Sequence, residues 1–236
     1  MAAPRSNGAF GGLQRAERSH SARTIVRACR SAHRTGPAAQ DCCVRILLDG
    51  GYGASSASRS YPSRLEGELR SLLPERDIVV VNRGVNGEDA EEMLARLQRS
   101  VLAAQPDLVI WQVGTNALLD GYPMARERAL IRQGIRRLLH AGIDVVLMDP
   151  QYAPAVTERP RATRFVELLD RIGRGARVGV FHRFAIMRYW NEGQKLPFHA
   201  FVKNDGLHMN DWAYDCTARL LAGAILEAVA RTAPVL

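Results

Sequence analysis

The chain has 236 residues, of which 47% are hydrophobic and 24% are charged, a composition typical of one folded domain with a sizeable core. Its net charge is +8, but residues 1–40 hold seven arginines against Glu17 alone and so supply +6 of it. Only +2 remains for residues 41–236, so a basic nucleic-acid face on the folded part is not expected. No run approaches the roughly 18 apolar residues that a membrane span needs.

Residues 1–40 mix Ala, Gly, Ser and Arg without a sustained hydrophobic period of 2 or 3.6 residues. We expect this segment to be disordered or spurious. An Arg-rich, Ser-rich and acid-poor start is also typical of an organelle transit peptide, which stays open as the alternative. No apolar core of a secretory signal is visible, so the sequence predicts a soluble chain that is cytoplasmic by default, and it leaves the actual compartment and the oligomeric state open.

From residue 41 onward, continuous apolar runs alternate with amphipathic stretches. The runs are CVRILL (43–48), DIVVVN (77–82), DLVIWQV (107–113), DVVLMD (144–149) and RVGVF (177–181). Such runs are typical of parallel strands that are covered on both faces. The stretches between them carry apolar stripes at helical spacing, and a last helix is expected from Trp212 to about Val229. The pattern predicts one α/β domain over residues 41–236, a three-layer α/β/α sandwich with a five-stranded parallel sheet.

The four cysteines do not form a recognisable framework. Cys42 and Cys43 are adjacent, Cys29 lies in the N-terminal segment and Cys216 falls on an apolar helical pattern. None of these positions has the CxxC spacing of a metal or redox site. We expect buried or incidental thiols, and no metal site.

Ligands of parallel sheets sit beyond the carboxyl ends of the strands, so the following segments are the places to search. After the second run comes NRGVNGED (82–89), which is either an ordinary turn or a loop where Gly87 lets its backbone N–H approach a ligand oxygen. Glu88 and Asp89 suit the first turn of the next helix. After the third run comes VGTNALL (113–119), where Asn116 is either a helix cap or an oxyanion donor.

The segment NDGLHMNDW (204–212), just before the last helix, carries a paired acid and base. Asp205 and His208 are three residues apart, so the carboxylate can reach one ring nitrogen and leave the other to act as a general base. His140 falls on a helical stretch, and His182 and His199 lack a paired carboxylate at useful spacing. We interpret these three as structural or surface residues.

With these segments in order, the chain resembles the SGNH hydrolases, also called the GDSL esterase/lipase superfamily. NRGVNGE looks like the block of the oxyanion glycine, which maps to Gly87, and GTN looks like the block of the oxyanion asparagine, which maps to Asn116. DGLH matches the block of the catalytic Asp205 and His208, and YPSRLEGEL (61–69) is similar to the helix after the nucleophile loop. The resemblance implies a flavodoxin-like sandwich that hydrolyses small acyl or acetyl esters with a serine nucleophile and no metal or cofactor.

The first family block is missing. The family ends its first strand with Gly-Asp-Ser or a variant such as Gly-Ser-Ser, whereas RILLDGGYG (45–53) holds no serine before Ser55. The chain is therefore either a pseudoenzyme that only binds ligand or an enzyme in which Ser55 or Ser56 acts instead. A nucleotide-binding role for Gly50, Gly51 and Gly53 would need a phosphate-loop pattern, which this stretch does not complete.

A shifted reading frame offers a further explanation. If residues 40–52 are read one base out of frame, permitted codons allow KIVAFGSSSTAGT, a family-like first strand and nucleophile block with the serine at Leu47. We hypothesise that this segment is translated out of frame, which also accounts for the composition of residues 1–40. The nucleotide sequence decides it, because residues 47–51 must be encoded by something close to CTC-CTC-GAC-GGC-GGG.

Overall fold

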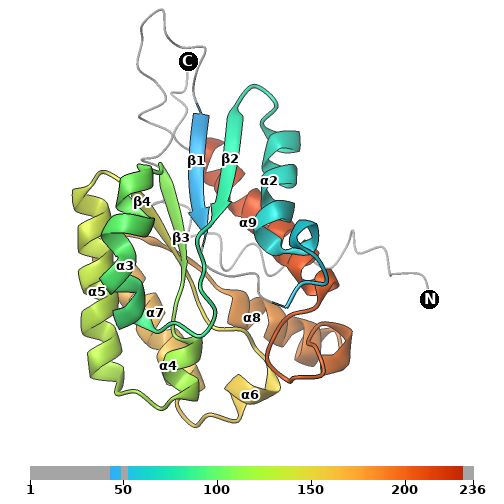
Figure 1. Ribbon diagram of the computed structural model, residues 1–236. Helices are drawn as coiled ribbons and strands as arrows, with labels where there is room; N and C mark the ends of the chain where they lie inside the picture. Colours follow the sequence, from blue (N-terminus) through green and yellow to red (C-terminus); the bar gives the residue numbers. More distant parts are fainter. Residues whose placement is uncertain (1–42, 49–52, 231–236) are drawn as a thin grey trace, which may run out of the picture.

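The computed structural model describes residues 43–48 and 53–230 (Figure 1). Residues 1–40, for which the sequence predicts a disordered or spurious segment, lie outside the described residues. So do residues 49–52 of the glycine-rich turn and residues 231–236.

The core of the fold is a five-stranded sheet with the strand order β2-β1-β3-β4-β5, in which every neighbouring pair is parallel. This confirms the predicted parallel sheet. The last three strands are shorter than their apolar runs, because the end residues of those runs already belong to the connecting loops. The strands are β1 (Cys43–Leu48), β2 (Asp77–Asn82), β3 (Leu108–Gln112), β4 (Asp144–Met148) and β5 (Gly179–Phe181).

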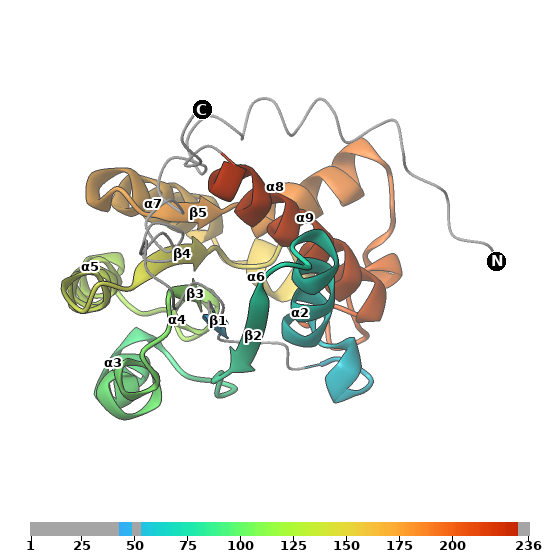
Figure 2. The same cartoon turned by 90° about the horizontal axis from the view of Figure 1, so that it is seen from above.

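Long helices cover both faces of the sheet, as Figure 2 shows from above. One layer contains α3 (Ala90–Ser100), α5 (Met124–His140) and α7 (Ala162–Ala176), and the other contains α2 (Tyr61–Leu72) and α9 (Asp211–Ala230). The predicted three-layer α/β/α sandwich is therefore confirmed, with a last helix one residue longer at each end than expected. The remaining helices are short: α4 (Thr115–Leu119), α6 (Pro154–Thr157), α8 (Arg183–Arg188), a π-helical turn (Tyr189–Gly193) and 3₁₀ turns at Ala57–Arg59, Leu102–Ala104 and Phe198–Ala200.

Each strand contributes side chains to two separate cores, because successive residues of a strand point to opposite faces. In β3, Ile110 packs in the core under α2 and α9, whereas its neighbours Val109 and Trp111 pack in the core under α3, α5 and α7. This double coverage is the reason that the strands read as continuous apolar runs. In the described part of the chain, no helix combines the length and the apolar character that crossing a membrane requires.

Candidate active site

A cavity of about 420 Å³ opens at the carboxyl edge of the sheet. This is the edge beside the short helices α4 and α6 in the lower part of Figure 1. Its lining includes Gly87 from the loop after β2, Asn116 from the start of α4 and His208 from the segment before α9. The structure therefore brings together residues from the three loops that the sequence singled out.

The Asp205 carboxylate contacts both the imidazole ring of His208 and the backbone N–H groups next to it. Its Oδ2 lies 2.9 Å from His208 Nδ1, and its Oδ1 accepts the backbone N–H groups of Leu207 and His208, both at 2.9 Å. Burial by itself raises the pKa of Asp205, but these backbone donors and the imidazole outweigh it and lower the pKa below its ordinary value. The carboxylate is therefore charged near neutral pH and orients the ring through Nδ1.

Asn116 is not a helix cap. Gly114 occupies the N-cap of α4 with a φ of 96°, and Asn116 is the second residue of the helix. Its side-chain Nδ2 donates to the backbone carbonyl of Glu88 at 2.8 Å, which ties the amide to the turn that contains Gly87. Gly87 has a φ of 85°, and a Cβ placed on it would meet no atom within 4 Å, so its backbone borders open space.

Two acidic residues fix the turn that follows Gly87. The Glu88 carboxylate accepts Arg96 Nε at 2.8 and 2.7 Å through its two oxygens. Asp89 is the N-cap of α3 and forms a reciprocal capping box with Glu92, so Glu88 and Asp89 precede the helix instead of lying in its first turn. The Glu88–Arg96 contact and the Asp89 cap therefore hold the turn at Gly87 against α3.

Sequence reasoning missed a buried polar network beneath the cavity. Arg183, which is 3% exposed, donates to Gln112 Oε1 at 2.7 Å, to Gln151 Oε1 at 2.9 Å and to the Asp149 carbonyl at 3.1 Å. Burial lowers the pKa of its guanidinium. The only signal in the sequence was that Gln112, Asp149 and Gln151 fall at the carboxyl ends of apolar runs.

Gln151 links the two loops that meet at the cavity. Its Oε1 accepts the Thr115 hydroxyl at 3.0 Å, and its Nε2 donates to the Leu207 carbonyl at 3.3 Å. Thr115 precedes Asn116, and Leu207 precedes His208. Gln151 contacts both loops and therefore helps to set the distance between Asn116 and His208.

His182, for which the sequence shows no carboxylate at useful spacing, lies near one in the folded chain. Its Nδ1 lies 3.6 Å from Oδ2 of Asp149, which is fully buried at the end of β4. The two residues are far apart in sequence, so only the pairing of β4 with β5 brings them together. His140 is the last residue of α5, and His199 lies in a 3₁₀ turn.

No serine or cysteine is present among the described residues that line the cavity. The hydroxyl groups there belong to Thr115, which donates to Gln151, and to Tyr214, where burial raises the pKa to about 12. The first described residue after the glycine-rich turn instead brings a glycine close to His208. A Cβ on Gly53, which has a φ of 104°, would lie 2.8 Å from His208 Cβ.

The serines proposed as substitutes bond elsewhere. The Ser55 hydroxyl donates to Asp211 Oδ2 at 2.5 Å and its backbone N–H donates to Oδ1 at 2.8 Å. Ser56 Oγ lies 3.1 Å from Ser58 Oγ. Position 47 pairs with Val81 and Val109, so it lies inside the sheet.

The described residues contain no group of three His, Cys, Asp or Glu side chains placed to hold a metal ion. Cys216 is partly buried in α9, and burial raises its thiol pKa to about 11. Cys29 and Cys42 lie outside the described residues.

Residues 38–231 match the model of the non-GDSL lipase-like family. Among curated proteins, an arylesterase from Vibrio mimicus is 25% identical over 186 residues, covering 73% of this chain and 85% of its own length. An acetylxylan esterase from Geobacillus stearothermophilus is 26% identical over 128 residues, covering 50% of this chain and 58% of its own length.

Solved structures show the same fold. An acetylxylan esterase from Geobacillus stearothermophilus superposes with a TM-score of 0.63 at 20% identity, covering 79% of this chain and 93% of that one. A two-domain esterase active on acetylated mannans superposes with a TM-score of 0.68 at 16% identity, covering 91% of this chain and 56% of that one. With the family match over most of its length, the chain belongs to the non-GDSL lipase-like family of SGNH-like hydrolases.

Proposed function

We propose that this site is that of an SGNH-type serine esterase for small acyl or acetyl esters, and that its nucleophile block is lost or frame-shifted in this chain. Asp205 is the orienting carboxylate, His208 the general base, and Gly87 and Asn116 are the oxyanion donors. The observation that carries the proposal is the Asp205–His208 pair at 2.9 Å, with His208 lining the same cavity as Gly87 and Asn116.

The geometry supports a specific role for each of these residues in the reaction. With Nδ1 held by Asp205, His208 would act through Nε2, taking the proton from a serine that attacks the ester carbonyl. The negative charge then develops on the carbonyl oxygen. The Gly87 backbone N–H and the second hydrogen on Asn116 Nδ2, the first being donated to Glu88, would stabilise that charge.

Related proteins support both the reaction and the substrate class. The curated relatives are an arylesterase and an acetylxylan esterase. In the solved structure of a catalytic mutant of that acetylxylan esterase, a serine is replaced by alanine. We extend the ester chemistry, but no particular sugar or alcohol, to this chain.

The register of β1 sharpens the frame-shift hypothesis. Position 47 is opposite Val81 and Val109, one residue before Asn82 and three residues before Gln112, both of which line the cavity. At about 3.3 Å per residue, a serine placed there would lie roughly 3–10 Å short of these lining residues. The repaired strand must therefore slide by a few residues toward the carboxyl edge, which the KIVAFG segment allows because it supplies a new apolar strand upstream.

The test compares four proteins in the hydrolysis of p-nitrophenyl acetate. Replacing residues 40–52 by KIVAFGSSSTAGT should restore turnover, whereas the chain as written and the point variant Leu47→Ser should stay near background. His208→Ala in the repaired chain should remove the restored activity, because loss of a triad member typically costs about 10⁴-fold or more. A repaired chain that is active but indifferent to His208→Ala would overturn the site assignment.

A pseudoenzyme is the second candidate, favoured by the lack of serine and cysteine in the described cavity lining. It predicts that the chain as written binds a small acetyl ester in calorimetry without turnover, and that the repaired chain is also inactive. Brisk turnover by the chain as written that is lost in Ser55→Ala would instead contradict both candidates. That result would identify a substitute nucleophile.

A further inference from the structure

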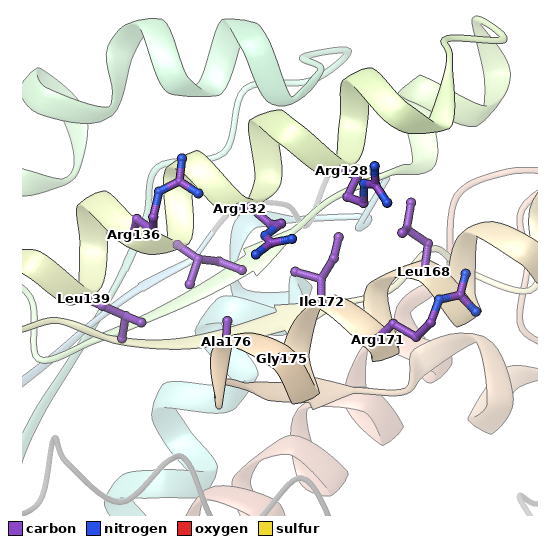
Figure 3. Close-up of a pocket in the computed structure, with 10 residues that line it drawn as sticks. Arg128, Arg132, Arg136, Leu139, Leu168, Arg171, Ile172, Gly175 and Ala176 are labelled. Carbon is purple, nitrogen blue, oxygen red and sulfur yellow. The ribbon is translucent and has the colours of Figure 1, made fainter.

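The outer surface of the α5–α7 layer carries a row of exposed arginines. Arg128, Arg132 and Arg136 follow one another at four-residue spacing along α5, and Arg171 lies across from them on α7 (Figure 3). Between this row and Arg171 lies a groove of about 460 Å³. Residues four apart lie on one side of a helix, so the three α5 guanidinium groups extend from the same surface. We call these four residues the arginine face.

Tertiary structure concentrates positive charge in this layer. α5 and α7 together contain eight arginines and three acidic residues, a net charge of +5. Residues 41–236 as a whole carry +2, so everything else in that range sums to −3. A nearly neutral domain therefore has a strongly basic side.

The α5 row is not balanced by acids of the protein. Arg126, on the same helix, contacts the carboxylates of Asp89, Glu91 and Glu127. By contrast, no acidic residue in the described ranges forms an ion pair with Arg128, Arg132 or Arg136. Like charges at four-residue spacing destabilise a helix, so this row favours an external anion.

The chemistry of the groove selects among possible anions. Its lining contains no aromatic side chain on which a nucleic-acid base could stack. The large exposed hydrophobic residues of the described chain lie elsewhere, so the groove offers no apolar anchor for a protein partner. Its apolar floor is closed, since Ile135 and Ile172 are buried. What remains is a row of three guanidinium groups that spans about 12 Å along α5, suited to contact several phosphate groups at a charged surface.

We propose that the arginine face docks the protein on the surface of an anionic lipid bilayer. Each arginine near such a surface contributes about 1 kcal/mol, or roughly fivefold in lipid affinity, and the attraction is screened by salt. The face is a side of the sandwich, whereas the candidate active site opens at the carboxyl edge beside α4 (Figure 1). Docking would therefore leave the cavity open next to the membrane. The proposal does not depend on the esterase assignment.

The experiment measures co-sedimentation of the full chain with vesicles of phosphatidylcholine and phosphatidylserine in equal parts. The test variant carries Arg128→Gln, Arg132→Gln and Arg136→Gln. The matched control carries three substitutions outside the face, Arg159→Gln, Arg188→Gln and Lys195→Gln, all at exposed positions. Both variants change the net charge from +8 to +5 and keep the basic residues 1–40, so only the place of the lost charge differs.

We expect the test variant to lose about 100-fold in lipid affinity at low salt, and the control a few-fold at most. A triple Arg→Lys variant at 128, 132 and 136 keeps the charge and should still bind, and thermal melts check that each variant is folded. Equal losses in the two glutamine variants, or wild-type binding that is no better than to pure phosphatidylcholine, would overturn the proposal. So would a test variant that loses single-stranded DNA binding while retaining vesicle binding, because the face would then serve nucleic acid.

Discussion

Gln151→Met should destabilise the protein by removing the acceptor on which the buried network depends. Gln151 is 5% exposed, and its Oε1 accepts both the Arg183 guanidinium and the Thr115 hydroxyl. Methionine fills a similar volume but accepts hydrogen bonds only weakly. The substitution therefore leaves a buried charged donor and a buried hydroxyl short of a partner, with little change in packing.

The size of the effect follows from these two contacts. A hydrogen bond to a charged group contributes about 1.5–3 kcal/mol and a neutral one about 1 kcal/mol, so the loss should be about 3 kcal/mol. Gln151→Glu is the matched control. It keeps an acceptor for Arg183 and Thr115 and adds a charge that pairs with Arg183, but it replaces the 3.3 Å donation to the Leu207 carbonyl by an oxygen–oxygen contact, so its loss should stay clearly below that of Gln151→Met.

Urea unfolding at neutral pH, followed by the fluorescence of the three tryptophans, measures this difference. With a denaturant slope of about 2 kcal/mol/M, Gln151→Met should lower the midpoint by roughly 1.5 M, and Gln151→Glu by well under 1 M. The reasoning is refuted if the glutamate variant is as unstable as the methionine variant, because the acceptor would then not be what matters. An unchanged midpoint for Gln151→Met would refute it equally.

Three further predictions concern stability near the site. Gly114→Ala should lower the free energy of unfolding by at least about 2 kcal/mol, because Gly114 has a φ of 96° and a new Cβ would lie 2.1 Å from Phe165 Cε1. An unchanged melting temperature would contradict this. Asp89→Ala should cost about 1–2 kcal/mol by removing the α3 cap, and Asp89→Asn, which can still cap, should cost less in the same urea assay. The pKa values of Asp205 and Asp211 are lowered by folding, so their contribution is complete above about pH 4 and is lost as pH falls through the folded values. Urea titrations below pH 4 should show this loss, and a stability that rises on acidification would contradict it.

The sheet and its helical layers were readable from the sequence, because double coverage leaves a direct trace in the residue order. Strands buried on both faces become continuous apolar runs, and helices with one buried face become stripes at helical spacing. The rule that loops at the carboxyl ends of parallel strands meet at one edge then placed Gly87, Asn116 and His208 in the same region. Asp205 and His208 are three residues apart, so their contact was a local expectation.

Contacts between segments that are distant in the sequence could be identified only in the folded structure. Asn116 bonds to the carbonyl of Glu88, 28 residues earlier, and Arg183 reaches Gln112, 71 residues earlier. Neither pair has a spacing or motif that marks it, since each depends on which loops the sheet order makes neighbours. The position of residue 47 inside β1 likewise depends on the pairing register with β3, which the residue order alone did not determine.

By itself, then, the sequence determined the α/β class, the edge at which the candidate site lies and the absence of a serine in the expected block, since all three follow from local patterns. Only the tertiary structure decided how Gln151 and Arg183 join the loops, which carboxylate lies near His182 and how a nearly neutral domain gathers its arginines on one side. The physical reason is that periodicity records which face of an element is buried. It does not record which distant side chains the packing of those faces brings within hydrogen-bond distance.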